Sequence, residues 1–124
     1  MFTDHNGIRF ESTGDDDGSW YGAFTVEDIH RQPYGIVHGG MYAALAETVA
    51  SMGTAATVVA EGMICMGQSH ATNFLRSVTE GVVEAHAVPV HRGRTTWVWE
   101  IDMMSDGNRV ARSTVTMAVR PARG

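Results

Sequence analysis

The sequence predicts an α+β fold in which one long central helix is wrapped by a curled antiparallel sheet of about five to six strands. From Gly39 to about Ala60, small and apolar residues recur at steps of three and four, the spacing of a helix. After that segment the apolar period changes to two, which is typical of strands. The helix is apolar on nearly every side, so it needs cover on all sides, and a curled sheet can supply that cover.

The remaining elements follow from turn signals and alternation. Residues 1–17 look irregular and solvated, and a first strand is expected at residues 20–26. Four antiparallel strands are expected after the helix, over residues 64–77, 82–91, 97–103 and 109–120. Asp106-Gly107, between the last two, is a hairpin signal. No linker is long enough to divide the chain, so residues 1–124 are expected to form one domain.

Composition narrows the class of protein. Hydrophobic residues make up 44% and charged residues 19% of the 124 positions, which is a globular balance. The single cysteine, Cys65, excludes an intrachain disulfide framework, and no secretion signal opens the sequence, so a cytoplasmic location is expected. A net charge of −5 argues against a nucleic-acid partner.

The basic residues are all arginines, and they are unevenly placed. Residues 76–124 hold seven arginines against five acids, whereas residues 1–75 hold nine acids against two arginines. Arginine can bind phosphate with two parallel hydrogen bonds, so the C-terminal part could meet a phosphorylated ligand. The alternative is that the arginines reflect only genome composition.

Glu47 is the residue that most needs explanation. It is the only acidic or arginine residue between His38 and Glu61, on a helix without a polar face. A buried, unpaired carboxylate is costly, so it needs partners, a raised pKa or a water-filled site. Ser51, at i+4, lies on the same face. The pair indicates either a catalytic carboxylate or a glutamate bonded at a subunit interface. A membrane span would fit the helix length, but Glu47 near its middle argues against one.

A second candidate feature is His38-Gly39-Gly40 at the start of the helix. The first N–H groups of a helix are unpaired and carry partial positive charge. Glycine lets a ligand approach this backbone closely, so the segment could polarise a carbonyl and hold an oxyanion. The alternative is an ordinary glycine loop before a helix.

Two other patterns are set aside. Gly67-Gln68-Ser69-His70-Ala71 approximates a nucleophile elbow, but its last glycine is missing and no helix follows. No metal-binding spacing is found among the six histidines, which are His5, His30, His38, His70, His86 and His91.

The chain resembles the hotdog-fold acyl-CoA thioesterases over nearly its whole length from Gly18. The segments that carry the resemblance are Tyr34-Gly35-Ile36-Val37-His38-Gly39-Gly40, Ala46-Glu47, Asn73-Phe74-Leu75-Arg76 and His91-Arg92-Gly93-Arg94-Thr95. More narrowly, it is similar to the phenylacetate-pathway and glutamate-type 4-hydroxybenzoyl-CoA thioesterases. Many relatives have aspartate at the position of Glu47, and Ser77 stands where relatives often have proline.

The resemblance implies a role for each matching residue. The Gly39 N–H would polarise the thioester carbonyl with help from Gln32, and His38 would support the loop. Glu47 would attack the carbonyl or activate water, with Ser51 orienting either one. The substrate-binding positions would be Gly40, Arg76, Arg94 and Thr95, the last three near the coenzyme A nucleotide. No metal or redox cofactor is implied, because coenzyme A is part of the substrate.

The expected function is hydrolysis of an aromatic acyl-CoA, such as a hydroxybenzoyl, phenylacetyl or dihydroxynaphthoyl thioester. The alternatives are a medium-chain fatty acyl-CoA thioesterase, an enoyl-thioester hydratase, and a non-catalytic acyl-CoA binding module. Gly39 and Glu47 are eight residues apart, or about 12 Å along a helix, too far for both to reach one thioester carbon. We therefore expect a homodimer or dimer of dimers with active sites at the subunit interface, and no membrane partner.

Overall fold

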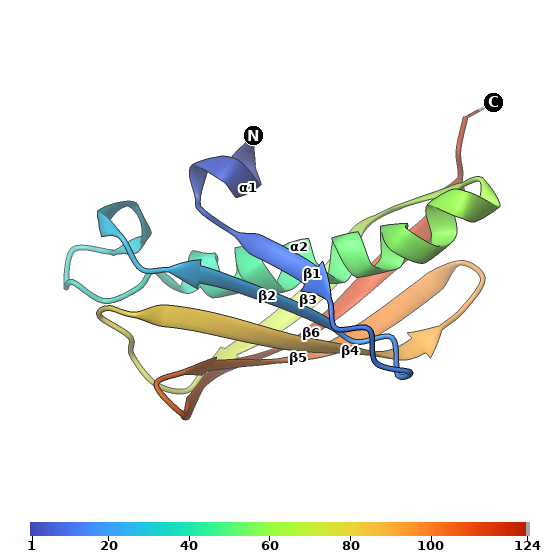
Figure 1. The fold of residues 1–124 in the computed structure, drawn as a ribbon. Helices are drawn as coiled ribbons and strands as arrows, with labels where there is room; N and C mark the ends of the chain where they lie inside the picture. The colour runs from blue at the N-terminus through green and yellow to red at the C-terminus, as the bar shows by residue number, and fades with distance from the viewer. Residues whose placement is uncertain (124) are drawn as a thin grey trace.

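A computed structural model of the protein describes residues 1–123. One six-stranded antiparallel sheet curls against a single long helix, as Figure 1 shows, with strand order β1-β2-β4-β5-β6-β3. The elements are α1 (Phe2–His5), β1 (Arg9–Ser12), β2 (Trp20–Thr25), α2 (Gly39–Val58), β3 (Met63–Phe74), β4 (Val82–Arg92), β5 (Thr96–Ser105) and β6 (Asn108–Pro121), with 3-10 turns at Asp28–His30 and Val59–Glu61. The predicted architecture and its order of elements are confirmed.

The prediction of an irregular N-terminal segment was partly wrong. Residues 1–17 are not irregular throughout, because they contain α1 and the edge strand β1, which pairs with β2 from Arg9↔Ala23 to Ser12↔Trp20. All four residues of β1 are exposed. A strand exposed on both faces has no apolar alternation, so the pattern from which strands are predicted is missing here.

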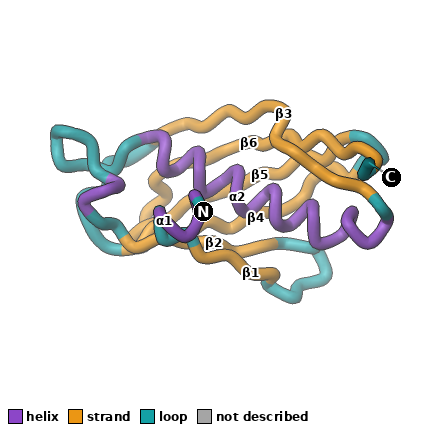
Figure 2. The backbone as a smooth tube through the Cα atoms, turned by 90° about the horizontal axis from the view of Figure 1, so that it is seen from above, coloured by secondary structure: helices purple, strands orange, loops and turns teal. Residues whose placement is uncertain are grey.

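The inner face of α2 forms the centre of the core. Leu45 and Val49 are fully buried beneath the sheet, and Gly53 lets the ring of Trp99 come close. The Trp99 Nε1–H donates to Thr54 Oγ1 at 2.9 Å, so the buried indole has a partner. Figure 2 shows α2 crossing the sheet, with β3 and β6 to one side of it and β1 and β2 to the other.

The prediction that the sheet covers the outer face of α2 was also wrong. The sheet was predicted to cover the helix on all sides, but Figure 2 shows α2 from above with its outer face not covered by the sheet. The Glu47 side chain is 50% exposed and Met52 is 38% exposed. The helix is long and apolar enough to span a membrane by length and composition. Its packing against the sheet instead makes it the core helix of the fold.

The turn predicted at Asp106-Gly107 is confirmed, and it joins β5 to β6. Asp106 and Gly107 have φ of 51° and 78°, so both lie in the left-handed region. A two-residue turn of this kind matches the right-handed twist of the strands.

Candidate active site

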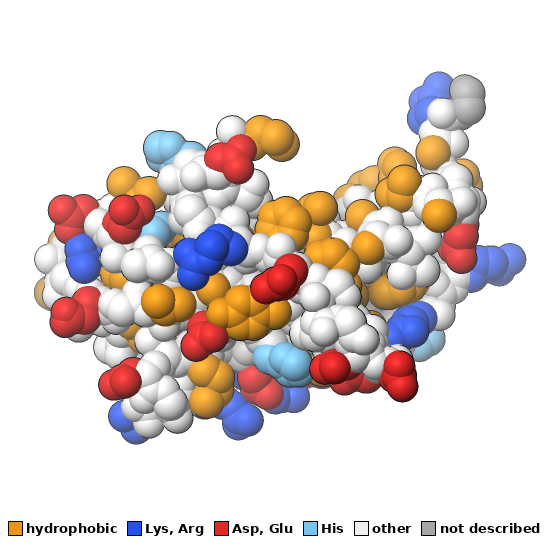
Figure 3. All heavy atoms as spheres, in the orientation of Figure 1, with side chains coloured by type: hydrophobic (Ala, Val, Ile, Leu, Met, Phe, Trp, Pro, Cys, Tyr) orange, Lys and Arg blue, Asp and Glu red, His pale blue; other side chains and the backbone are white. Residues whose placement is uncertain are grey.

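Glu47 lines a hollow of about 400 Å³ on the outer face of α2. Gly40, Thr48 and Ser51 line it from the same helix, and His70 lines it from β3. In Figure 3 the outline of the molecule dips between α1 and the lobe that contains the C-terminal end of α2. The structure therefore brings together Glu47, Ser51 and Gly40, three of the residues that the sequence analysis selected.

Two residues of strand β3 lie beside the Glu47 carboxylate. A Cβ atom built on Gly67 would lie 3.0 Å from Glu47 Oε2, so a larger residue there would crowd the carboxylate. His70 Nε2 lies 3.5 Å from Glu47 Oε1. Neither residue was predicted from the sequence to belong to the site. An isolated glycine within a strand is a signal of close approach or of a bulge, and Gly67 carries that signal.

The start of α2 offers a free amide. His38 is the N-cap, and its Nδ1 accepts from the Gly40 N–H at 2.8 Å. The Gly39 N–H has no hydrogen-bond partner within residues 1–123. A Cβ on Gly39 would lie 2.8 Å from the Phe74 ring, so glycine suits the close packing there. The catalytic roles expected for His38 and Gly39 stay predictions.

Gln32 lies near Gly39 in a second hollow, of about 410 Å³, which Arg76 and Tyr42 also line. The Gln32 carboxamide oxygen accepts from the Tyr34 N–H, which leaves its NH₂ group as the donor for a ligand. Gln32 and Gly39 thus form a donor pair that lines one hollow, and its role at a carbonyl or oxyanion stays a prediction.

The donor pair and the carboxylate line different hollows. Gln32 and Gly39 are in one, and Glu47 and Ser51 are in the other. The rise of α2 separates Gly39 from Glu47 by about 12 Å. Within one chain, the two halves of the expected chemistry are not brought together.

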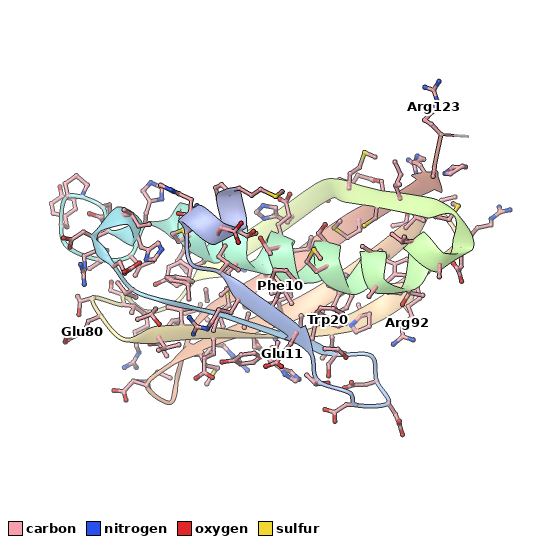
Figure 4. All side chains as sticks on the ribbon, turned by 45° about the horizontal axis from the view of Figure 1, so that its top comes forward. Phe10, Glu11, Trp20, Glu80, Arg92 and Arg123 are labelled. Carbon is pink, nitrogen blue, oxygen red and sulfur yellow. The ribbon has the colours of Figure 1, made fainter. Side chains whose placement is uncertain are left out.

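The candidate coenzyme A residues are also separated. Arg76 follows the C-terminal end of β3, whereas Arg94 and Thr95 lie beside Met63 at its beginning. The 12 residues from Met63 to Phe74 span about 36 Å, because 11 steps of about 3.3 Å separate the first from the last. Figure 4 labels two residues close to them in the chain, and Glu80 and Arg92 lie far apart along the molecule in that view. Arg76 and Arg94 of one chain therefore cannot contact the same nucleotide.

Cys65 lies beside Ser51, with its Sγ donating to the Ser51 carbonyl at 3.5 Å. Burial raises the pKa of the Cys65 thiol. The thiolate is the reactive form, so this cysteine is not poised as a nucleophile.

The structure also describes the two sequence patterns that were set aside, the nucleophile-elbow pattern and the histidines. Gly67-Gln68-Ser69-His70-Ala71 lies entirely in β3, without the turn and helix of a nucleophile elbow. Within residues 1–123, no three His, Cys, Asp or Glu side chains converge as a metal site. His30 is buried, with Nδ1 accepting from the Glu27 N–H and Nε2 lying 2.8 Å from the Asn6 carbonyl oxygen, so its role is structural.

The fold and site together define a class. A six-stranded antiparallel sheet curled against one long central helix is the hotdog fold, in which many thioesterases are built. The family model of the thioesterase superfamily matches residues 34–112. The chain belongs to the thioesterase superfamily.

Individual relatives agree with this assignment. The chain is 39% identical over 119 residues to the esterase PA1618 of Pseudomonas aeruginosa, covering 95% of this chain and 81% of that protein. The crystal structure of a mutant of PA1618, there called a thioesterase, matches with a TM-score of 0.92 at 37% identity and covers 98% of this chain and 86% of that one. The chain is also 34% identical over 117 residues to the proofreading thioesterase EntH of Cronobacter turicensis, covering 94% of this chain and 83% of EntH.

These likenesses confirm the hotdog fold and a thioester hydrolase. They extend to the superfamily and not to the phenylacetate or 4-hydroxybenzoyl-CoA branch, which stays a prediction.

Proposed function

We propose that the protein hydrolyses an aromatic acyl-CoA to the free acid and coenzyme A at a site shared by two subunits. The observation that supports this most is the separation of two half-sites on one helix. The Glu47 carboxylate is accessible on the outer face of α2, and the Gly39 N–H, which has no hydrogen-bond partner among the described residues, lies at its start. Two helices side by side and antiparallel would set Glu47 of each chain near Gly39 of the other.

The proposed reaction uses a water molecule and no cofactor. Glu47 takes a proton from water while the oxygen adds to the thioester carbon. The Gly39 N–H and the Gln32 NH₂ donate to the resulting oxyanion. The C–S bond then breaks, the thiolate takes the proton from Glu47, and the acid and coenzyme A leave. In the alternative, Glu47 adds to the carbonyl directly, expels the thiolate, and the resulting anhydride is hydrolysed.

The acyl group is proposed from the sequence resemblance, with medium-chain fatty acyl groups as the second candidate. A panel of hydroxybenzoyl, phenylacetyl, dihydroxynaphthoyl and medium-chain acyl-CoAs, with a thiol reagent to detect coenzyme A, tests it by kcat/KM. Aromatic substrates are expected to give the highest values. Higher values for the medium-chain set would support the second candidate. Binding without any release of coenzyme A would support a binding module instead.

The shared site is tested with mixed dimers. Glu47→Gln chains and Gly39→Pro chains, carrying different tags, are co-expressed and the heterodimer is purified through both tags. Each heterodimer has one site with Glu47 from one chain and the Gly39 N–H from the other, so about half of the wild-type activity is expected. Inactive heterodimers, together with an active wild-type monomer, would contradict the proposal.

The separation of Arg76 from Arg94 within one chain also points to a site shared between subunits. Arg76, Arg94 and Thr95 are proposed to reach the coenzyme A nucleotide from different subunits, in a dimer or a dimer of dimers. Alanine at Arg76 or at Arg94 is expected to raise KM and to weaken its dependence on salt, because phosphate contacts are screened by ions. A change in kcat alone would contradict this role.

The proposed location of the enzyme is the cytoplasm.

A further inference from the structure

The pairing register of β3 explains why His70 faces Glu47. Gly67 pairs with Met117 and Ser69 pairs with Thr116, so Gln68 is an extra residue without a partner in β6. Such a bulge changes which residues of the strand share a face. Before it, odd-numbered residues such as Gly67 point toward α2, and after it the even-numbered His70 does.

Partners in β6 support this assignment of faces. Directly opposite residues in an antiparallel pair point to the same side. Gly67 is opposite Met117 and His70 is opposite Val115, and both of these β6 residues are fully buried. The bulge therefore places a glycine and a histidine successively on the side of β3 that faces Glu47.

The two residues face different oxygens of one carboxylate. Gly67 leaves space beside Oε2, and His70 Nε2 lies 3.5 Å from Oε1. The distance is long for a direct hydrogen bond, but contacts of this kind often shorten when substrate binds. The His70 side chain is 28% exposed and the Glu47 side chain 50%, so the histidine is the more enclosed of the two.

We infer that His70 is a positioning residue, whose ring N–H holds Oε1 of Glu47 and fixes the direction in which the carboxylate meets water or the thioester. This rests on the proposed function of Glu47. A carboxylate on a flexible side chain loses rate when it is misdirected, and a displacement of 1 Å can cost up to about 100-fold. His70 is thus expected to act on kcat through Glu47 and not through binding of the substrate.

The test compares two replacements of the same histidine. Gln places its amide nitrogen near the position of His Nε2 and can donate, whereas Leu fills space and cannot. His70→Leu is expected to lower kcat by about 10- to 100-fold with KM nearly unchanged, and His70→Gln to recover most of that loss. His86→Leu is the matched control, because His86 is exposed in β4 and opposite Tyr21 of β2.

A double variant separates positioning from a general structural effect. In a Glu47→Gln background, His70→Leu is expected to change kcat little further, because the group that it positions is already disabled. Thermal unfolding of each variant confirms that the fold is retained, and His70→Ala replaces His70→Leu if the leucine variant does not fold.

The outcomes distinguish this inference from the proposed function. If Glu47→Gln is impaired while His70→Leu has wild-type kcat, only the role of His70 is wrong. The same holds if His70→Gln is as impaired as His70→Leu. If Glu47→Gln has wild-type activity, or the wild-type enzyme releases no coenzyme A, both the function and the inference fail.

Discussion

The two faces of α2 are both built largely from small and apolar residues, but the inner face packs in the core and the outer face carries the candidate catalytic carboxylate. The inner face packs Leu45, Val49 and Gly53 against the sheet, and its buried Thr54 hydroxyl accepts a hydrogen bond from Trp99. The outer face carries Glu47 and is accessible. Changes on the inner face should therefore alter stability and leave chemistry intact, and changes to the reacting groups should do the reverse.

The largest effect is expected at Glu47. Glu47→Gln keeps the size of the side chain but removes its charge, so kcat should fall by about 10²- to 10⁴-fold. The free energy of unfolding should change by less than about 0.5 kcal/mol, because the side chain is half exposed. Steady-state kinetics and urea unfolding measure the two effects. Loss of stability without loss of kcat would reverse the comparison.

The start of the helix should give the next largest effect. Gly39→Pro removes the N–H that is proposed to donate to the oxyanion, at a helix position that tolerates proline. Gly39→Ala is its control, because it adds a Cβ against Phe74 but keeps the N–H. The proline variant should have a kcat about 10²- to 10³-fold below that of the alanine variant. Equal kcat values in the two would exclude the N–H from catalysis.

The inner face is tested at Thr54. Thr54→Val keeps the shape but leaves the Trp99 N–H without its acceptor, so the free energy of unfolding should fall by about 1–3 kcal/mol. Thr57→Val, at an exposed position of the same helix, should change it by less than about 0.5 kcal/mol. Denaturant unfolding measures both. An equal loss in the two variants would mean that the hydrogen bond is not the cause.

The smallest effect concerns Tyr42, whose hydroxyl is buried without a partner among the described residues. Burial raises the pKa of Tyr42 above its usual value of 10.0, so the folded state favours the neutral phenol. That contribution to stability is complete below pH 10 and is lost as the pH rises through the raised value.

Tyr42→Phe is therefore expected to be at least as stable as the wild type at pH 7. Above pH 10 its advantage in the free energy of unfolding should grow, because phenylalanine does not ionise. Unfolding by urea across this range measures the difference. Tyr34→Phe is the control, since Tyr34 is 89% exposed, and a matching gain there would contradict the argument.

Much of the fold could be predicted from periodicity and turn signals. The long helix and the strands after it were predicted in the right order, because each has an apolar face that repeats with its own period. The edge strand β1 was missed, because all of its residues are exposed and its pairing with β2 depends on backbone hydrogen bonds. His38, Gly39 and Glu47 could be predicted as site residues, because a lone charge on an apolar helix and glycines at a helix start can be recognised in the sequence alone.

The sequence by itself determined the class of fold, the candidate carboxylate and the candidate oxyanion donor, because local period and spacing encode these. Only the tertiary structure decided which neighbours the carboxylate has. A single unpaired residue, Gln68, reverses the faces of β3, so that His70 and not Ser69 points at Glu47. That outcome depends on pairing between β3 and β6, which are more than 30 residues apart in the chain, and no local pattern specifies such a register.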